Sequence, residues 1–395
     1  MSNIALVYPN RAIEVQRTGV VPTGLYGTDW VNNTNLPLSN ILTDCLPETA
    51  RTAQTKCSFA VALKSIPYRI IGAAALLNHN LTTSARIKHT IFNEPPIGYS
   101  YTAMLARPVG NTRIFTVLGL STSLVGKSVA LIACSNDPQV NDLPTMVISV
   151  SSHSLSTGAI NGTITASSVT TSSPSFSQWY VGDLTTKAIK VVNAPKWQNV
   201  WQRIFDVDSP FLVWESTNFW TGTIEEEQRQ GYTKLCLNFF KSVDDAALQP
   251  SGTHIHIDIN DSSNTDGYID IGYFMFGQYF QSAINPQYGS IEHGYLDNST
   301  SRQSDSGQKY FHEKSKARTV SIGYEMLDKA EAFSGIFEAY RQQGISRPVI
   351  YSFSPIRTDN HQYAQSFIGR FMQLNPITQP NYGFFSATIN LEEML

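Results

Sequence analysis

The chain has 395 residues, of which 42% are hydrophobic and only 15% are charged, and its formal net charge is −3. An average soluble chain has roughly 25% charged residues, and here Ser, Thr, Asn and Gln take the place of the missing charges. A general nucleic-acid binder needs basic clusters to meet phosphates, and this near-neutral chain has none, so that class is excluded. The length is enough for about two to three domains.

The N-terminal residues 1–10 lack a basic region followed by an apolar stretch, so no signal peptide is predicted. No window approaches the roughly 18 apolar residues of a membrane span, and we expect no membrane insertion. The chain is therefore expected to be made and kept in the cytoplasm, or released by a route other than secretion. In that setting the cysteines, which lack zinc-binding spacing, are expected to be buried reduced thiols: Cys45, Cys57, Cys134 and Cys236.

Two strand signatures far apart in the chain match each other. After a lead-in rich in Pro, Asn and Gly, in which residues 4–8 are a candidate strand, the first signature covers 58–63 and 68–77. The second covers 254–259 and 268–277. In each signature two strands are joined by a turn, and β-branched or aromatic residues occupy the alternate positions that would face the core. We therefore expect each signature to be a β-hairpin. Together they predict the two ends of one antiparallel sandwich with a shared core.

The chain between these signatures changes character. From about residue 97 to 185 it is rich in Ser and Thr but keeps regular short apolar runs, at 115–118, 129–133, 146–150 and 163–166. Regular apolar runs are not typical of a disordered linker, so this tract is predicted to be an inserted β subdomain.

The last hundred residues predict a compact α+β module. A strand is expected at 320–327, followed by a helix over 328–344, where apolar residues recur at helical spacing and Gly344 gives the stop. Three further strands are expected at 348–353, 366–371 and 384–391. One helix that covers a small sheet is a common arrangement for such a module.

The order of these parts carries a resemblance to a known family. The matching motifs are His79-Asn80-Leu81 followed by Ala85-Arg86-Ile87, the turn 261–264 followed by 267–272, and a tail with Arg318, Gly344 and Leu391-Glu392-Glu393. In this order they resemble tail and baseplate proteins of tailed bacteriophages, whose jelly roll is of the galactose-binding, discoidin-like type. The resemblance covers roughly residues 36–95 and 230–395 and leaves out the Ser/Thr-rich insert.

The resemblance implies a mainly β fold: a galactose-binding-like jelly-roll sandwich with a β-rich insert and a small C-terminal α+β domain. The expected division is 1–96 for the N-terminal half of the jelly roll, 97–185 for the insert, 186–290 for the C-terminal half and 291–395 for an assembly domain. The implied function is that of a structural component of the virion, at the tail tip or baseplate, assembled in the host cytoplasm. Its expected partners are other tail proteins and further copies of itself in a ring or trimer.

One candidate metal site lies on the second signature. His254, His256 and Asp258 alternate on one face of a strand, and two imidazoles with a carboxylate could bind zinc or iron. The alternative is that they form the polar face of a half-buried strand, because isoleucines alternate on the opposite face. We favour the second interpretation and predict no metal or other cofactor.

A second candidate is the polar turn that follows. Its alternating oxygen-bearing residues faintly resemble a calcium loop, although the downstream bidentate Glu is absent, and an Asx-rich β-turn explains the same pattern. A structural calcium ion therefore stays open, and the possible glycan or ion site comprises Asp261, Asn264, Asp266 and Tyr268.

No catalytic machinery is recognisable, so an enzyme is not predicted. The chain has no Gly-x-Ser-x-Gly elbow, and its dense acidic group at 225–227 lies in a polar stretch. Two alternatives remain to the assembly protein: a receptor-binding protein that recognises a host-surface glycan and, more distantly, a metal-dependent cupin-like enzyme. The aromatic residues available for stacking on sugars are Trp197, Trp201, Trp214, Trp220, Tyr268 and Tyr273.

Overall fold

The computed structural model describes the chain over a defined set of residues. These are 4–15, 17–18, 21–22, 24–28, 30–31, 35–63, 69–82, 84–92, 102–106, 112–116, 123–126, 128–134, 145–157, 159–167, 175–181, 198–199, 235–240, 249–312, 314–353, 355 and 365–394. The predicted mainly β fold is confirmed: antiparallel sheets dominate these residues. No helix among them has the length and apolar character needed to cross a membrane.

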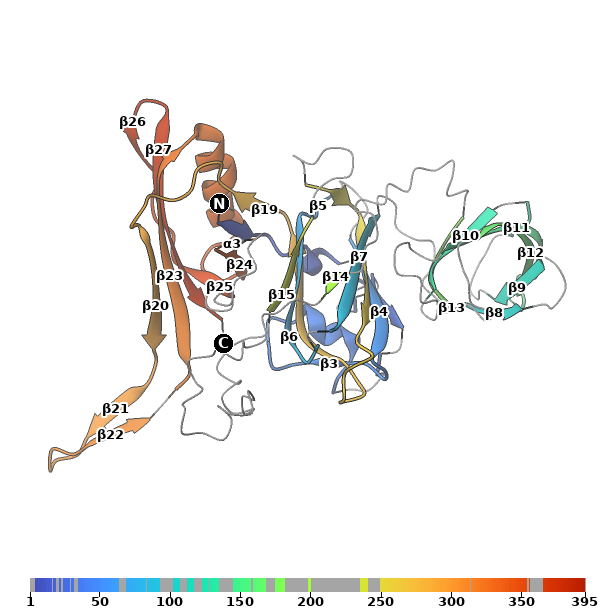
Figure 1. Ribbon diagram of the computed structural model, residues 1–395, viewed down its shortest axis with the longest axis horizontal. Helices are drawn as coiled ribbons and strands as arrows, with labels where there is room; N and C mark the ends of the chain where they lie inside the picture. The colour runs from blue at the N-terminus through green and yellow to red at the C-terminus, as the bar shows by residue number, and fades with distance from the viewer. Residues whose placement is uncertain are drawn as a thin grey trace.

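The centre of the molecule is a pair of sheets that share one core (Figure 1). The first sheet has the order β14-β7-β17-β4-β2, with β14 (Gln198–Asn199), β7 (Arg86–Phe92), β17 (His254–Asn260), β4 (Lys56–Ala62) and β2 (Leu25–Thr28). The second has the order β15-β6-β18-β3, with β15 (Leu235–Phe239), β6 (Ala73–His79), β18 (Asp270–Gly277) and β3 (Ala50–Arg51). A two-stranded sheet joins β5 (Arg69–Ile70) to β16 (Ser251–Gly252), and two 3₁₀ helices, η1 (Arg11–Glu14) and η2 (Leu38–Leu42), complete this part.

The two expected hairpins do not form, and this expectation is wrong. β4 pairs along its whole length with β17, and β6 pairs with β18, so each strand finds its partner in the other signature. β4 and β6 therefore lie in different sheets, as do β17 and β18. Each turn crosses from one sheet to the other, because both of its strands present apolar residues to the same core.

That common core confirms that the two signatures belong together. Ile255 and Ile257 of β17 and Phe59 of β4 contribute from one sheet, and Phe274 and Phe276 of β18 contribute from the other. The ring of Phe59 meets the ring of Phe274 edge-on, with centroids 5.1 Å apart, which is a favourable aromatic geometry.

The C-terminal part is an eight-stranded sheet with a helix on one face. Its order is β19-β1-β24-β25-β27-β23-β20, with β26 on β27. The bounds are β19 (Tyr279–Gln281), β1 (Ala5–Val7), β24 (Val349–Ser352), β25 (Ser366–Gln373), β27 (Phe384–Glu393), β23 (Lys316–Leu327), β20 (Ile291–Asp297) and β26 (Thr378–Asn381). The strand expected at residues 4–8 is thus present as β1, and it pairs with β24, although sequence analysis placed residues 1–96 in the sandwich.

The predicted helix is confirmed, with a local difference. It contains a π-helical segment, η3 (Glu331–Phe337), which continues as α3 (Glu338–Gln343). Ala332, Ile336 and Tyr340 face the sheet and are buried against it. Gly344 ends the helix with φ of +54°, a left-handed conformation that glycine adopts without steric cost.

The sandwich and the C-terminal sheet are packed into one stack. Leu77 of β6 and Tyr273 and Met275 of β18 point away from the sandwich core and contact Ile350 of β24 and Ile368 of β25. β6 and β18 are consequently buried on both faces, which explains their almost unbroken apolar sequence.

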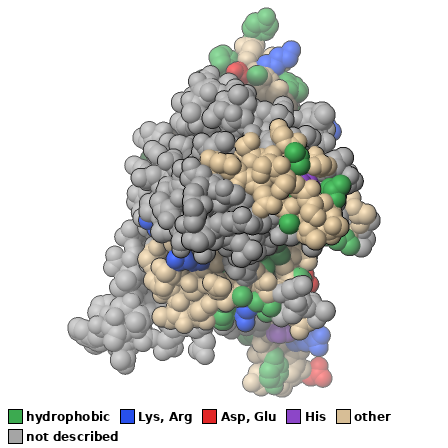
Figure 2. Space-filling view, turned by 90° about the vertical axis from the view of Figure 1, so that its right-hand side faces the viewer, with side chains coloured by type: hydrophobic (Ala, Val, Ile, Leu, Met, Phe, Trp, Pro, Cys, Tyr) green, Lys and Arg blue, Asp and Glu red, His purple; other side chains and the backbone are tan. Residues whose placement is uncertain are grey.

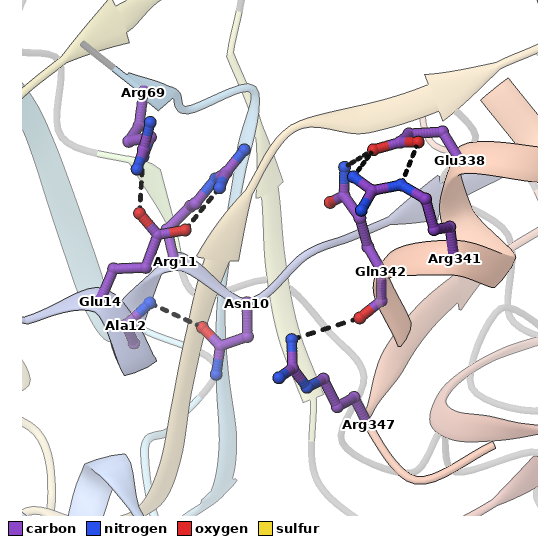
Figure 3. Close-up of polar contacts among 9 residues, drawn as sticks. All are labelled: Asn10, Arg11, Ala12, Glu14, Arg69, Glu338, Arg341, Gln342 and Arg347. Atoms are coloured by element: carbon purple, nitrogen blue, oxygen red, sulfur yellow. Dashed lines mark hydrogen bonds and ion pairs between the residues drawn. The ribbon is translucent and has the colours of Figure 1, made fainter. Parts of the chain in front are cut away.

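The chain crosses between the two bodies directly after β1, and polar contacts line this crossing (Figure 3). Asn10 is buried and donates from Nδ2 to the Tyr273 hydroxyl at 2.7 Å. On the sandwich side Glu14 is held by Arg11 and Arg69, and the two arginines outweigh the effect of burial, so the pKa of Glu14 is lowered.

The insert folds as a closed β-barrel on the side of the sandwich away from the C-terminal sheet (Figure 1). Its strands follow the order β10-β11-β12-β9-β8-β13, with β8 (Thr102–Ala106), β9 (Thr112–Thr116), β10 (Ser128–Cys134), β11 (Thr145–His153), β12 (Ala159–Ser167) and β13 (Ser175–Val181). Figure 2 looks onto this side, where uncharged surface with scattered apolar side chains predominates among the described residues.

Because β6 is buried on both faces, its neighbouring leucines should contribute similar amounts to the free energy of unfolding. Leu76→Ala removes packing from the sandwich core and Leu77→Ala from the second interface, and each should lower the free energy of unfolding by about 2–5 kcal/mol. Leu155→Ala, at an exposed turn of the barrel, should change it by less than about 0.5 kcal/mol. Urea unfolding measures all three, and a Leu77→Ala protein that matches Leu155→Ala would contradict the stack.

Candidate functional site

The residues singled out as a possible metal site on β17 form a buried polar row. His254 and His256 are 0% and 1% exposed, so this face is not half-buried as expected. His256 Nε2 lies 3.0 Å from Asp258 Oδ1, and Lys88 Nζ of β7 lies 3.9 Å from Asp258 Oδ2. The row is therefore a buried ion-pair cluster across two neighbouring strands.

The charges in this row follow from burial and from each other. Burial acts to raise the pKa of Asp258, but His256 and Lys88 outweigh it, so the pKa lies below its usual value and the carboxylate stays ionised. Burial holds the pKa of His254 well below its usual value, with a further contribution from His256, so His254 is neutral. Among the described residues, no three His, Cys, Asp or Glu side chains are grouped so as to hold a metal ion.

A further histidine lies on the core face of the same sheet. His89 of β7 is directly opposite Ile257 and packs against the ring of Phe240, with centroids 5.1 Å apart. Burial lowers the pKa of His89 to about 3, against a smaller opposing effect of Asp258. The sequence pattern did not single out this residue, because a histidine in an alternating strand is ambiguous between the two faces.

His89 predicts acid sensitivity. Between its unfolded pKa of about 6.5 and its folded pKa of about 3, only the unfolded chain binds the proton, so stability is complete above pH 6.5 and falls on acidification. From pH 7.5 to 5.0 this histidine should remove about 2 kcal/mol. In His89→Leu the loss over this interval should be smaller by that amount, as measured by urea unfolding at both pH values. An unchanged loss would contradict the assignment.

The loop from Asp261 to Tyr268, the candidate glycan or ion site, is tied to the turn after β6. Both oxygens of the buried Asp261 carboxylate accept from Thr82, Oδ1 from the hydroxyl at 2.5 Å and Oδ2 from the backbone N–H at 2.9 Å. Asn264 donates to Asp261 Oδ2 and accepts from the Asp266 backbone N–H at 2.9 Å. The carboxylate is therefore hydrogen-bonded by donors that the protein itself supplies, as in an Asx-rich turn.

Asn80 closes the same network. Its Nδ2 donates to Asp266 Oδ2 at 2.9 Å and to the Tyr268 carbonyl at 3.1 Å, and its Oδ1 accepts from the Asp270 N–H at 2.8 Å. The Tyr268 ring is covered on one face by the Arg51 guanidinium, 3.8 Å from the ring centroid. That face is not open to a sugar ring.

We expect this network, and not a bound cation, to hold the loop. Asn80→Ala removes three hydrogen bonds and should lower the free energy of unfolding by about 1–3 kcal/mol. Added Ca²⁺ should leave the melting temperature of the wild-type protein unchanged relative to EDTA. A Ca²⁺-dependent rise that is lost in Asp261→Asn would instead establish a calcium site.

A cleft of about 870 Å³ lies where the sandwich meets the C-terminal sheet. Its charged lining residues include Asp44, Arg370 and Glu393, and Cys45 is exposed beside them, contrary to the expected burial of the cysteines. The other lining residues are Thr43, Leu46, Pro47, Asn298, Ala317, Glu392 and Met394. Cys57 and Cys236 are buried and form no disulfide, as expected, and the side chain of Cys134 lies outside the described residues.

A buried ion pair lies beside this cleft and joins two parts of the tail motif that contributed to the resemblance. Arg318 at the start of β23 donates from Nε to Glu393 Oε2 at 2.8 Å and from Nη2 to Oε1. Its backbone N–H also donates to the same carboxylate at 3.1 Å. Removing one member of such a buried pair leaves an uncompensated charge, which is strongly destabilising.

Exposed apolar side chains gather on the C-terminal part of the chain. Of nineteen large apolar residues exposed in the described part of the chain, fourteen lie between residues 284 and 384. One group lies at the end of β20 and on the protruding ribbon that follows it, hereafter the arm, which is residues 298–315 with β21 (Thr300–Gln303) and β22 (Lys309–His312). The group is Tyr295 and Leu296 on β20 and Tyr310 and Phe311 on the arm. A second, hereafter the apolar end, comprises Met326, Phe333, Phe337, Tyr382 and Phe384.

Sequence analysis missed the arm. Its residues are mostly polar and show no sustained alternation, which hides a strand from pattern analysis. A signal was nevertheless present, because the turn residues Asp305-Ser306-Gly307 are followed, after two polar residues, by the aromatic pair at 310–311. The tryptophans considered for sugar stacking, at 197, 201, 214 and 220, and the acidic group at 225–227 lie outside the described residues, whereas Tyr273 is buried and unavailable.

Neither the models of known protein families nor the curated proteins contain a match to this chain.

Proposed function

We propose that this chain is a structural component of a bacteriophage tail tip or baseplate that acts by protein–protein assembly. The observation that carries the proposal is the concentration of exposed apolar side chains on the C-terminal part of the chain, between residues 284 and 384. Soluble monomers rarely keep large apolar patches exposed, and such patches mark interaction surfaces. The low charge of the chain limits repulsion between copies.

The finer fold is part of the proposal. Along the sandwich, successive strands alternate between the two sheets, from β2 through β3, β4 and β6 to β7, and again from β14 through β15 and β17 to β18. This alternation is the pattern of a jelly roll, and we infer the galactose-binding-like type from the motif resemblance. Here the sandwich would serve as a rigid support for the assembly surface in the virion, next to other tail proteins.

A second candidate is recognition of a host-surface glycan, favoured by the cleft of about 870 Å³. Its carboxylates, Asn298 and Thr43 are groups that hydrogen-bond sugar hydroxyls. The aromatic stacking surface expected of a sugar site is not among the lining residues in the described part of the chain. We therefore rank assembly first.

Purified virions test the two roles. Quantitative mass spectrometry should find the chain in a fixed copy number in isolated tails, and Asp44→Ala, inside the cleft, should leave both copy number and adsorption unchanged. If Asp44→Ala particles contain the chain but lose adsorption to cells, the glycan-binding role is correct. If the chain is absent from purified particles, the structural role is wrong.

A further inference from the structure

The arm is a part of the chain that cannot bury its own apolar residues. β21 and β22 pair with each other and with no other described strand, and all eight of their residues are exposed. Tyr310 and Phe311 are 58% and 72% exposed. A two-stranded ribbon is only marginally stable in water, so its order and its exposed aromatic pair together call for an external contact.

The arm is also directed rigidly away from the body. Its strands continue β20 and β23, which pair from Ile291↔Ile322 to Asp297↔Lys316. At the root of the arm, the buried Arg318–Glu393 pair fixes β23 to β27. The arm therefore projects from the lower end of the sheet in Figure 1.

The apolar end lies at the opposite end of the same sheet (Figure 1). Within it Phe333 contacts Phe337, with ring centroids 5.9 Å apart, and Phe333 also contacts the partly buried Phe385 beside it at 5.2 Å. β23 runs from the arm to this end over twelve residues, a length of roughly 36 Å at about 3.3 Å per residue. The arm cannot fold back over that distance, so any contact between the two surfaces is between different molecules.

The two surfaces are complementary in charge as well. The arm contains three Lys or Arg and two Asp or Glu, a net charge of +1, and Lys316 at its root lies 4.0 Å from Asp297 of β20. Residues 325–341, which lead into and form the helix of the apolar end, contain four Asp or Glu and two Lys or Arg, a net charge of −2. Within the latter, Glu338 is engaged by Arg341 and Gln342 (Figure 3), while Glu325 is exposed.

We infer that the arm of one copy docks on the apolar end of the next copy, with Tyr310 and Phe311 against Met326, Phe333 and Phe337. This inference rests on the proposed assembly function and names its partner, a second copy of this chain. The contact joins two different surfaces, so it is a head-to-tail contact, which closes into a ring when the rotation between copies permits.

A complementation experiment with the full chain tests the contact. The arm variant carries Tyr310→Ser and Phe311→Ser, the end variant carries Met326→Ser and Phe337→Ser, and the control is Leu155→Ser on the barrel, another exposed apolar residue. Light scattering coupled to size-exclusion chromatography should show oligomers for the wild type and the control. Each variant alone should require at least about a tenfold higher concentration to assemble, as expected for loss of an aromatic anchor.

Mixing the variants gives the decisive readout. The arm variant keeps an intact apolar end and the end variant keeps an intact arm, so a mixture should form a heterodimer that grows no further. Glu325→Lys should weaken assembly without altering the fold, as seen by circular dichroism.

Three outcomes overturn the inference. They are a monomeric wild type at all accessible concentrations, an arm variant that assembles normally, or an end variant that assembles alone while the mixture gives no heterodimer, which would indicate arm-to-arm contact. None of these decides the structural role, because that role is read separately from the presence of the chain in purified particles.

Discussion

The rest of the architecture depends on the β6–β18 pair, the two strands buried on both faces. One face supplies the sandwich core and the other packs on β24 and β25 of the C-terminal sheet. A polar group buried on either side of such a pair needs a hydrogen-bond partner. The central stretches 73–77 and 271–276 are accordingly apolar or glycine, and the one hydroxyl among them, on Tyr273, is hydrogen-bonded to Asn10 and Asp44. The sandwich and the C-terminal sheet are therefore energetically one unit.

The N-terminal segment strengthens this unit. β1 inserts between β19 and β24 in the C-terminal sheet, and the Tyr8 hydroxyl, buried beneath the helix, donates to the Gly335 carbonyl at 2.7 Å. The chain then enters the sandwich through the buried Asn10. A chain that begins in one body and continues in the other links the two in the same way as the packed interface. A truncation at residue 317 would remove the cover of β6 and β18 and the partner of β1, so the sandwich is not expected to keep its native packing without the C-terminal sheet.

The sequence allowed the strands to be predicted but not their partners. The unbroken apolar runs at 73–77 and 271–276 predict buried strands correctly, and the 3.6-residue spacing over 328–344 predicts the helix, because both patterns are local. Pairing is set by long-range packing. The local pattern of two strands beside a short turn therefore predicts a hairpin, whereas each of these strands pairs with one about 195 residues away. The candidate residues His254 and His256 show the same limit: alternation placed them opposite the isoleucines, but only the three-dimensional packing buries that second face as well.

The order of the three parts, C-terminal sheet, sandwich and barrel, also determines which part would face outward if copies assembled through the C-terminal part. The barrel lies on the side of the sandwich opposite that sheet, at the far end of the long axis of the molecule (Figure 1). Because the barrel lies beyond the sandwich, a ring joined through the arm and the apolar end would carry its barrels away from the contacts between copies. The Ser/Thr-rich sequence of the insert agrees with such a position, since a surface that faces water and not a neighbouring copy needs polar but not strongly charged residues. The same division explains why the exposed apolar residues concentrate at one end of the molecule, while the barrel exposes only single apolar side chains such as Val125 and Leu155 in its described part.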